Sequence, residues 1–267
     1  MLIQILKVSF YLSLSLFILL AVASLFFYLT QSPSNDRHWE FGQQVLQQVE
    51  FDGDQITIKD LRDYDWGADD HQAQYRDKQF ALDDIESIEV GVSHFSVHES
   101  IAHVFIVFGI KDQEDIGLSV EARRSVGEDY TISGGLRFSF DLAYFLTSKQ
   151  DLLSIRQQRN ERVYLFKTIA TPDVAQDLFK RLADRVNQLY ATPEFYHILF
   201  KNCASLVVAE VEKISDVHFP FYEKTFAPGF SGKALFEMGL LDTQQTSFSE
   251  VKSESLVTFE SKASKIH

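Results

Sequence analysis

Residues Tyr196–Ile214 read YHILFKNCASLVVAEVEKI and contain Cys203, the only cysteine among 267 residues. Apolar positions after Cys203 recur at roughly helical spacing, which predicts a helix over Cys203–Ile214. Asn202 is a favourable N-cap residue, so Cys203 falls in the first helical turn. There the helix dipole and free N–H groups are expected to lower the thiol pKa. This arrangement is typical of cysteine nucleophiles, and the alternative is a buried cysteine that packs as a small apolar side chain.

The N-terminal residues predict a membrane anchor. Ser9–Thr30 is uncharged and mostly apolar, and about 20 such residues span a bilayer. Lys7 precedes this run while Asp36 follows it, so the positive-inside rule places the remaining chain outside the cytoplasm. Ala21–Ala23 resembles a signal-peptide cleavage site, but the apolar run continues beyond it. We therefore favour an uncleaved signal anchor in the inner membrane over a removed signal peptide.

Composition limits the classes of partner. The formal net charge of −13 argues against nucleic acid and against charge-driven docking on anionic lipid. Apolar residues make up 45% of the chain, enough for a folded core. One cysteine in an exported protein makes no internal disulfide, so it is a free thiol. The predicted organisation is an anchor over 1–30, a linker and membrane-proximal helix over 31–50, a periplasmic domain over 51–243 and a mobile tail over 244–267.

A β-hairpin is predicted before the cysteine helix. Ala102–Phe108 and Ile116–Arg123 are two β-prone runs, and Gly109–Asp115 between them has turn composition. A turn centred near residue 112 places His103 directly opposite Glu121, and such pairs lie about 5 Å apart at Cβ. Ser119, Glu121 and Arg123 then share one face of the second strand.

The remaining pattern predicts an α+β fold. Further strands are expected at Gln55–Lys59, Ser87–Phe95 and Arg162–Ile169. Helices are expected at His38–Val49, Leu82–Ile88, Phe140–Leu146, Pro172–Tyr190 and about Ser231–Leu241.

These residues provide a candidate set for acyl transfer. Cys203 is the candidate nucleophile and His103 the candidate base, with Glu121 orienting the imidazole. The backbone N–H of Cys203 is a candidate oxyanion donor. Asn202, Ser119 and Arg123 are predicted to support this set, Arg123 by stabilising charge or by pairing with Glu121. The structural alternative is that His103 is a hydrogen-bonded strand residue.

No metal or organic cofactor is expected. His98–His103 reads HESIAH, which resembles a zinc-protease helix signature. That signature needs its second histidine where Ala102 stands, and the segment is predicted to be a strand. Arg156 and Arg159 are most simply interpreted as part of a solvated or salt-bridged face.

Several ordered motifs resemble the Lnb-type N-terminal periplasmic domain family. They are Ile58–Tyr64, Ala102–His103, Leu118–Arg123, Asp151–Arg159 and Pro193–Cys203, and the resemblance spans roughly Gln55–Ile214. The resemblance implies an envelope protein with a papain-like fold in permuted order, in which the histidine strand precedes the cysteine helix. It also implies Cys203 as nucleophile, His103 as base and Glu121 as orienting residue. Departures from the family pattern are His197, usually Asn, and Ala204, usually Thr.

The namesake of this family is a lipoprotein N-acyltransferase that works through a thioester. The resemblance therefore implies acyl transfer through a thioester on Cys203, with a lipid or lipoprotein as substrate. Two alternatives are a peptidoglycan or peptide amidase with the same Cys–His set, and a non-catalytic envelope scaffold. An apolar, membrane-facing groove favours lipid, whereas an open polar cleft favours cell-wall peptide.

Overall fold

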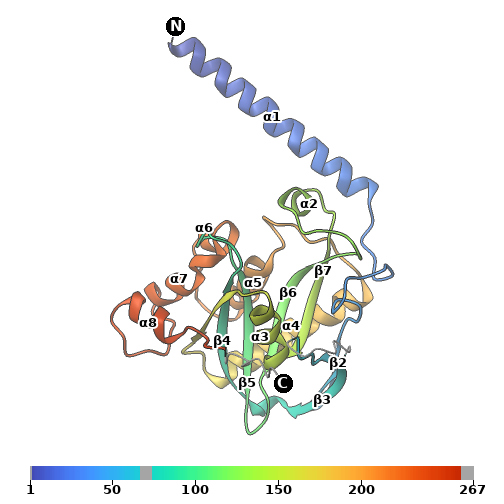
Figure 1. Cartoon of the computed structure of the whole chain (residues 1–267), viewed down its shortest axis with the longest axis vertical. Helices are drawn as coiled ribbons and strands as arrows, with labels where there is room; N and C mark the ends of the chain where they lie inside the picture. The colour runs from blue at the N-terminus through green and yellow to red at the C-terminus, as the bar shows by residue number, and fades with distance from the viewer. Residues whose placement is uncertain (1, 67–73, 260–267) are drawn as a thin grey trace, which may run out of the picture.

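The computed structural model describes residues 2–66 and 74–259. Helix α1 (Leu2–Thr30) extends away from a mixed α+β body built around one open sheet (Figure 1). Residues Leu6–Thr30 of α1 are long and apolar enough to cross a membrane. The mixture of helices and strands and the single N-terminal apolar helix are as predicted.

The sheet is mainly antiparallel. Its hydrogen-bonded order is β1-β2-β7-β6-β5-β4-β8, β3 pairs with β2, and only the β2–β7 contact is parallel. The strands are β1 (Gln48–Asp52), β2 (Gln55–Arg62), β3 (Tyr75–Ala81), β4 (Ile85–His94), β5 (His103–Ile110), β6 (Ile116–Arg123), β7 (Asp141–Ser148) and β8 (Arg162–Lys167).

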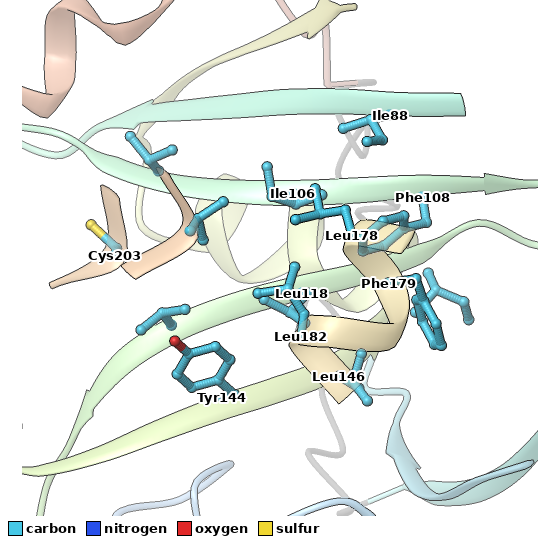
Figure 2. Packing of buried hydrophobic residues seen from close by; sticks show 14 of the residues in the cluster. Ile88, Ile106, Phe108, Leu118, Tyr144, Leu146, Leu178, Phe179, Leu182 and Cys203 are labelled. Carbon is cyan, nitrogen blue, oxygen red and sulfur yellow. The ribbon is translucent and has the colours of Figure 1, made fainter. Parts of the chain in front are cut away.

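Helices cover both faces of the sheet. On one face α4 (Pro172–Ala191) packs against β4 and β7 while α5 (Cys203–Ile214) packs against β5 and β6. Figure 2 shows Leu178, Phe179 and Leu182 of α4 over the strands, with Cys203 at the margin of this core. Full burial of each such side chain stabilises the fold by about 1.5–3 kcal/mol.

The opposite face of the sheet is covered by α3 (Lys149–Gln158). Its Leu152 packs with Phe105, Val107 and Val163 in a smaller cluster. The shorter helices are α2 (Ile132–Leu136), α6 (Phe221–Thr225), α7 (Ser231–Glu237) and α8 (Phe248–Glu254).

The β5–β6 hairpin has the predicted register. Phe105 lies opposite Ser119, and continuing the pairing by two residues places His103 opposite Glu121. In the turn Asp112 adopts a positive φ of 53°, a conformation that Asp tolerates better than most residues. The predicted α4 and α5 helices and the β8 strand are also confirmed.

The helix predicted over His38–Val49 is wrong. Gly42 has a φ of +80°, which ends any helical path. The carbonyl groups of Gln43 and Gln44 accept hydrogen bonds from the buried Arg123 guanidinium, both at 2.8 Å, rather than from a following helical turn. The end of the segment instead enters β1.

The helix predicted over Phe140–Leu146 is also wrong, because all of these residues after Phe140 lie in β7. All eight residues of β7 are buried. A strand buried on both faces shows a continuous apolar run without period-2 alternation, so its pattern resembles that of a buried helix.

Two other segments differ from expectation. Of the helix predicted over Leu82–Ile88, only a 3₁₀ turn at Leu82–Asp84 forms before β4 begins. The predicted tail contains α8, whose Val251 is buried, and the N–H of Val257 donates to the carbonyl of Val163 at 2.9 Å. Residues 260–267 of that tail lie outside the described residues.

Candidate active site

Asn202 caps the helix that begins at Cys203, as predicted. Its Oδ1 accepts hydrogen bonds from the N–H groups of Ala204 at 3.0 Å and Ser205 at 2.8 Å. Its Nδ2 donates to the carbonyl of Ile198 at 2.8 Å, which ties the cap to the preceding loop. These bonds fix the first turn of α5 and therefore the position of the thiol.

The thiol of Cys203 is buried beside β5. Burial raises the pKa of this thiol, and nearby backbone N–H groups of Val104, Ala204 and Cys203 only partly oppose the effect. The prediction of a lowered thiol pKa is therefore wrong, because desolvation of the thiolate outweighs the helix N-terminus. The resting side chain at neutral pH is the thiol.

A chain of hydrogen bonds joins His103 to Glu121 through a serine. His103 Nε2 lies 2.7 Å from Ser119 Oγ, and Ser119 Oγ donates to Glu121 Oε1 at 2.9 Å. The second oxygen of Glu121 accepts a hydrogen bond from Gln43 Nε2 at 3.1 Å. Glu121 therefore contacts His103 through the Ser119 hydroxyl rather than directly.

These contacts define which nitrogen of His103 carries a proton. Burial works to raise the pKa of Glu121, but positive charge, first that of Arg62, lowers it to about 2, so the carboxylate is ionised. The single Ser119 proton points to this carboxylate, so Ser119 Oγ accepts its other hydrogen bond from His103 Nε2–H. The free lone pair of the neutral ring is then on Nδ1.

His103 is neutral over the physiological range. Burial and, to a smaller extent, the charge of Arg156 lower its pKa against the opposing effect of Glu121, with a net value of about 3. The ring therefore has a proton-accepting nitrogen at neutral pH.

Arg123 lies away from this set, although it follows Glu121 on the same strand face. Its buried guanidinium binds the carbonyl groups of Gln43 and Gln44 and lies 4.0 Å from the centre of the Trp39 ring. Arg123 thus holds the N-terminal linker against β6. The predicted pairing with Glu121 is replaced by this contact.

His103, Glu121 and Cys203 line one pocket of about 410 Å³ at the end of the sheet. Neighbouring side chains in its wall include Tyr130 and Tyr196. The pocket is also lined by Gln43, Phe95, Ala102, Val120, Ala122, Arg124, Arg156, Arg159 and Glu161.

Sequence reasoning missed Gln43 and underrated Arg156 and Arg159. The expected helix over His38–Val49 gives no reason for Gln43 to contact Glu121, so this hydrogen bond could not be predicted. The arginines follow the helical i, i+3 spacing, a pattern also shown by ordinary surface helices.

His197 and His94 contact aromatic rings and do not line the pocket. His197 stacks on Phe200 and meets Phe138 at a tilt, with ring centres 4.8 and 4.7 Å away. His94 meets the ring of Tyr164 at 5.6 Å. Within residues 2–66 and 74–259 no cluster of His, Cys, Asp and Glu has an arrangement that could hold a metal ion.

No curated protein and no solved structure matches the chain. The model of one family, described as the Lnb N-terminal periplasmic domain, matches residues 71–224. That span is more than half of the 267-residue chain and includes His103, Glu121 and Cys203. The chain therefore belongs to the Lnb N-terminal periplasmic domain family.

Proposed function

We propose that this protein is a membrane-anchored periplasmic enzyme that transfers acyl groups through a thioester on Cys203. The observation that carries the proposal is the pocket shared by Cys203, His103 and Glu121, together with the Ser119 contact that leaves Nδ1 of His103 unprotonated. The histidine strand before the cysteine helix corresponds to a papain-like arrangement in permuted order.

In this mechanism the Cys203 thiol and the His103 imidazole both start neutral. Nδ1 of His103 takes the thiol proton as Sγ of Cys203 attacks an ester or amide carbonyl. Backbone N–H groups at the start of α5 stabilise the oxyanion that forms. Collapse of the tetrahedral species breaks the bond to the leaving group, which takes the proton from His103 and leaves a thioester. An amine or water then resolves the thioester, again with His103 handling the proton.

Glu121 acts on this proton transfer through Ser119. As His103 becomes positively charged, the ionised Glu121 stabilises the imidazolium across the Ser119 hydroxyl. The same hydrogen bonds hold the ring in the tautomer that the first step needs. Ser119 and Glu121 are therefore positioning residues for His103.

The lining and the location of the pocket favour different substrates. Three arginines and two glutamates in its wall make it a polar cleft, which by itself favours cell-wall peptide. Its location supports a lipid substrate, and we give the location more weight. The pocket lies where β4 and β6 end and β5 and β7 begin, the same end of the sheet that meets α1. Ser24 Oγ of α1 donates to the carbonyl of Leu136 at 3.0 Å, and the rings of Tyr28 and Phe138 lie 5.1 Å apart. The last turns of α1 therefore contact the α2 segment, and anchoring by α1 would bring this segment to the membrane surface.

Loops at this end of the sheet expose apolar side chains. Val97 after β4 is 90% exposed, and Ile132 in α2 is 63% exposed. Further exposed apolar residues in the same loops and in α6 are Phe95, Val126, Phe200, Phe221 and Tyr222. Apolar surface beside an anchor is favoured against the acyl boundary of a bilayer, which supports lipid over cell-wall peptide. We place the anchor in the inner membrane and the domain on its periplasmic side.

Intact-protein mass spectrometry of the anchored protein, purified from membranes, tests the proposal. The wild type should carry a fatty-acyl mass that hydroxylamine removes. His103→Ala should lose this adduct, and Cys203→Ser should lose it or retain a more stable ester. His98→Ala is the matched control, because His98 lies outside the pocket-lining set, and it should keep the adduct.

The absence of an adduct on the wild type would contradict acyl transfer and favour a scaffold. A peptide-sized adduct would replace lipid by cell-wall peptide as the substrate.

A further inference from the structure

Two arginines in the pocket have no part in the mechanism above. Arg156 lies in the last turn of α3 and Arg159 is the residue that caps this helix. Three residues apart, they lie on the same side of the helix, and both line the pocket that holds Cys203.

Arg156 is a buried cation with unused hydrogen-bonding capacity. The residue is 4% exposed, and within the described chain its Nε has no hydrogen-bond partner. One terminal nitrogen donates to the carbonyl of Leu152 at 2.5 Å, and the guanidinium lies 4.4 Å from the centre of the Phe105 ring. Buried charges are costly unless a partner satisfies them, so this group is arranged to receive an anion.

The carboxylates of the pocket are already bound by other donors. Glu121 accepts hydrogen bonds from Ser119 and Gln43, and Glu161 accepts one from Ser93. Burial lowers the pKa of Arg156, the charges of Glu121 and Glu161 oppose this effect, and the charge of Arg159 adds to it, with a net pKa of about 10. The two guanidinium groups therefore repel each other, and the two carboxylates do not fully offset the burial of Arg156. An anion placed between them would relieve this repulsion.

The charge in the pocket has the opposite sign to that of the whole chain. Arg124, Arg156 and Arg159 line it with only two carboxylates, Glu121 and Glu161, an excess of one positive charge. The chain as a whole has a formal net charge of −13. An excess of cations inside a cavity of an acidic protein concentrates anionic ligands there.

We propose that Arg156 and Arg159 bind a phosphate group of the substrate next to the Cys203 thiol. Planar guanidinium groups bind phosphate through paired N–H donors. This assignment rests on the proposed function, because it takes the substrate to be a membrane lipid. In a phospholipid the headgroup phosphate is only a few bonds from the ester carbonyl that Cys203 would attack. The apolar loops around the pocket favour such a lipid over an anionic peptide.

Calorimetric titration of the full chain in a neutral detergent with sn-glycerol 3-phosphate tests the site. The wild type should bind the probe, and Arg159→Gln should bind it at least tenfold more weakly. Arg156→Lys, which keeps the charge but removes the planar fork, should also weaken binding. Arg181→Gln is the matched control, because Arg181 lies on α4 near Glu210, outside the pocket-lining set, and it should bind like the wild type.

Two vesicle compositions distinguish the source of the phosphate. If a lipid headgroup occupies the site, phosphatidylglycerol vesicles should suppress probe binding, whereas vesicles of a phosphate-free galactolipid should not. Equal binding in both vesicles would assign the site to a free phosphate compound.

Binding should survive Cys203→Ser, so failure of acyl transfer and failure of the phosphate site are separate outcomes. The site is overturned if the wild type does not bind, if Arg159→Gln binds as tightly as the wild type, or if N-acetyl-D-alanine binds in place of the phosphate probe. This last result would indicate a carboxylate-bearing peptide.

Discussion

The hydroxyl of Ser119 determines the chemistry that His103 can perform. With its only proton directed to Glu121, Ser119 accepts from Nε2–H of His103, and Nδ1 is left as the basic nitrogen. The imidazole is neutral and the thiol is protonated, so in the proposed mechanism proton transfer accompanies nucleophilic attack rather than preceding it. The resting site therefore holds a neutral thiol and a neutral imidazole rather than a preformed thiolate–imidazolium pair.

Removing the Ser119 hydroxyl should separate catalysis from stability. We expect Ser119→Ala to reduce the rate of adduct formation about a hundredfold, because Nε2–H of His103 and Oε1 of Glu121 lose their common partner. The stability cost should be about 1–3 kcal/mol, measured by denaturant unfolding.

Thr147→Val is the matched control for that variant, because Thr147 is an equally buried residue on β7 whose hydroxyl donates to the backbone carbonyl of Ser148. It should lose similar stability and keep the rate. Equal rates in both variants would contradict the positioning role of Ser119.

The pH dependence of Cys203 alkylation tests the protonation states. Between about pH 5 and about pH 9 the rate with iodoacetamide should rise steadily without a plateau, because burial raises the thiol pKa. A thiolate paired with charged His103 would instead react at a constant rate across the acidic range. The measurement is made on the folded full chain, with the urea-denatured chain as reference.

The lowered pKa of His103 also predicts how the stability of the fold depends on pH. The unfolded ring takes up a proton near its ordinary pKa of 6.5, which the folded ring resists until about pH 3. The free energy of unfolding should therefore fall as the pH drops through this window.

At the scale of elements, the β5–β6 hairpin and the α5 N-terminus bring the site together. The hairpin register sets His103 against the Ser119–Glu121 pair, while the Asn202 cap sets Cys203 beside Val104 of the same hairpin. Each element is locally encoded, and packing of α5 on β5 and β6 joins them.

Loss of the α5 cap should affect both stability and thiol reactivity. We expect Asn202→Ala to cost about 1 kcal/mol, because the N–H groups of Ala204 and Ser205 lose their acceptor. Ser247→Ala removes the corresponding cap of α8 and should cost a similar amount. Only Asn202→Ala should change the alkylation rate of Cys203; an equal rate in both variants would show that the cap does not position the thiol.

At the scale of the whole molecule, the proposed anchoring by α1 determines which end of the sheet would meet the membrane. Ser24 lies six residues before Thr30, about 9 Å along the helix axis. Its hydrogen bond to Leu136 therefore places α2 beside the last turns of the span rather than below them. Figure 1 shows α2 next to α1, with the β5–β6 turn at the far end of the sheet.

This orientation predicts depth-dependent fluorescence quenching. In proteoliposomes that contain brominated lipid, the fluorescence that Ile132→Trp adds to that of the native Trp39 and Trp66 should be quenched, because in the proposed orientation α2 reaches the acyl boundary. Ile169→Trp is the matched control: Ile169 is 55% exposed, against 63% for Ile132, and follows β8 near the opposite end of the sheet. Equal quenching at both positions would contradict the orientation, and neither measurement depends on catalysis.

Local patterns in the amino-acid sequence were sufficient for several elements of this protein. The α1 anchor, the Asn202-capped helix and the β5–β6 register follow from runs of neighbouring residues and their periodicity. His103, Glu121 and Cys203 could therefore be selected as a candidate set before their surroundings were known.

Only the tertiary structure decided the rest, because the relevant energies depend on contacts between distant residues. The apolar run of β7 is a strand because β6 and β2 flank it, and residues 38–47 avoid a helix because Arg123 binds their carbonyl groups. The raised thiol pKa and the burial of Arg156 are likewise set by desolvation, a property of the packed body rather than of any local run.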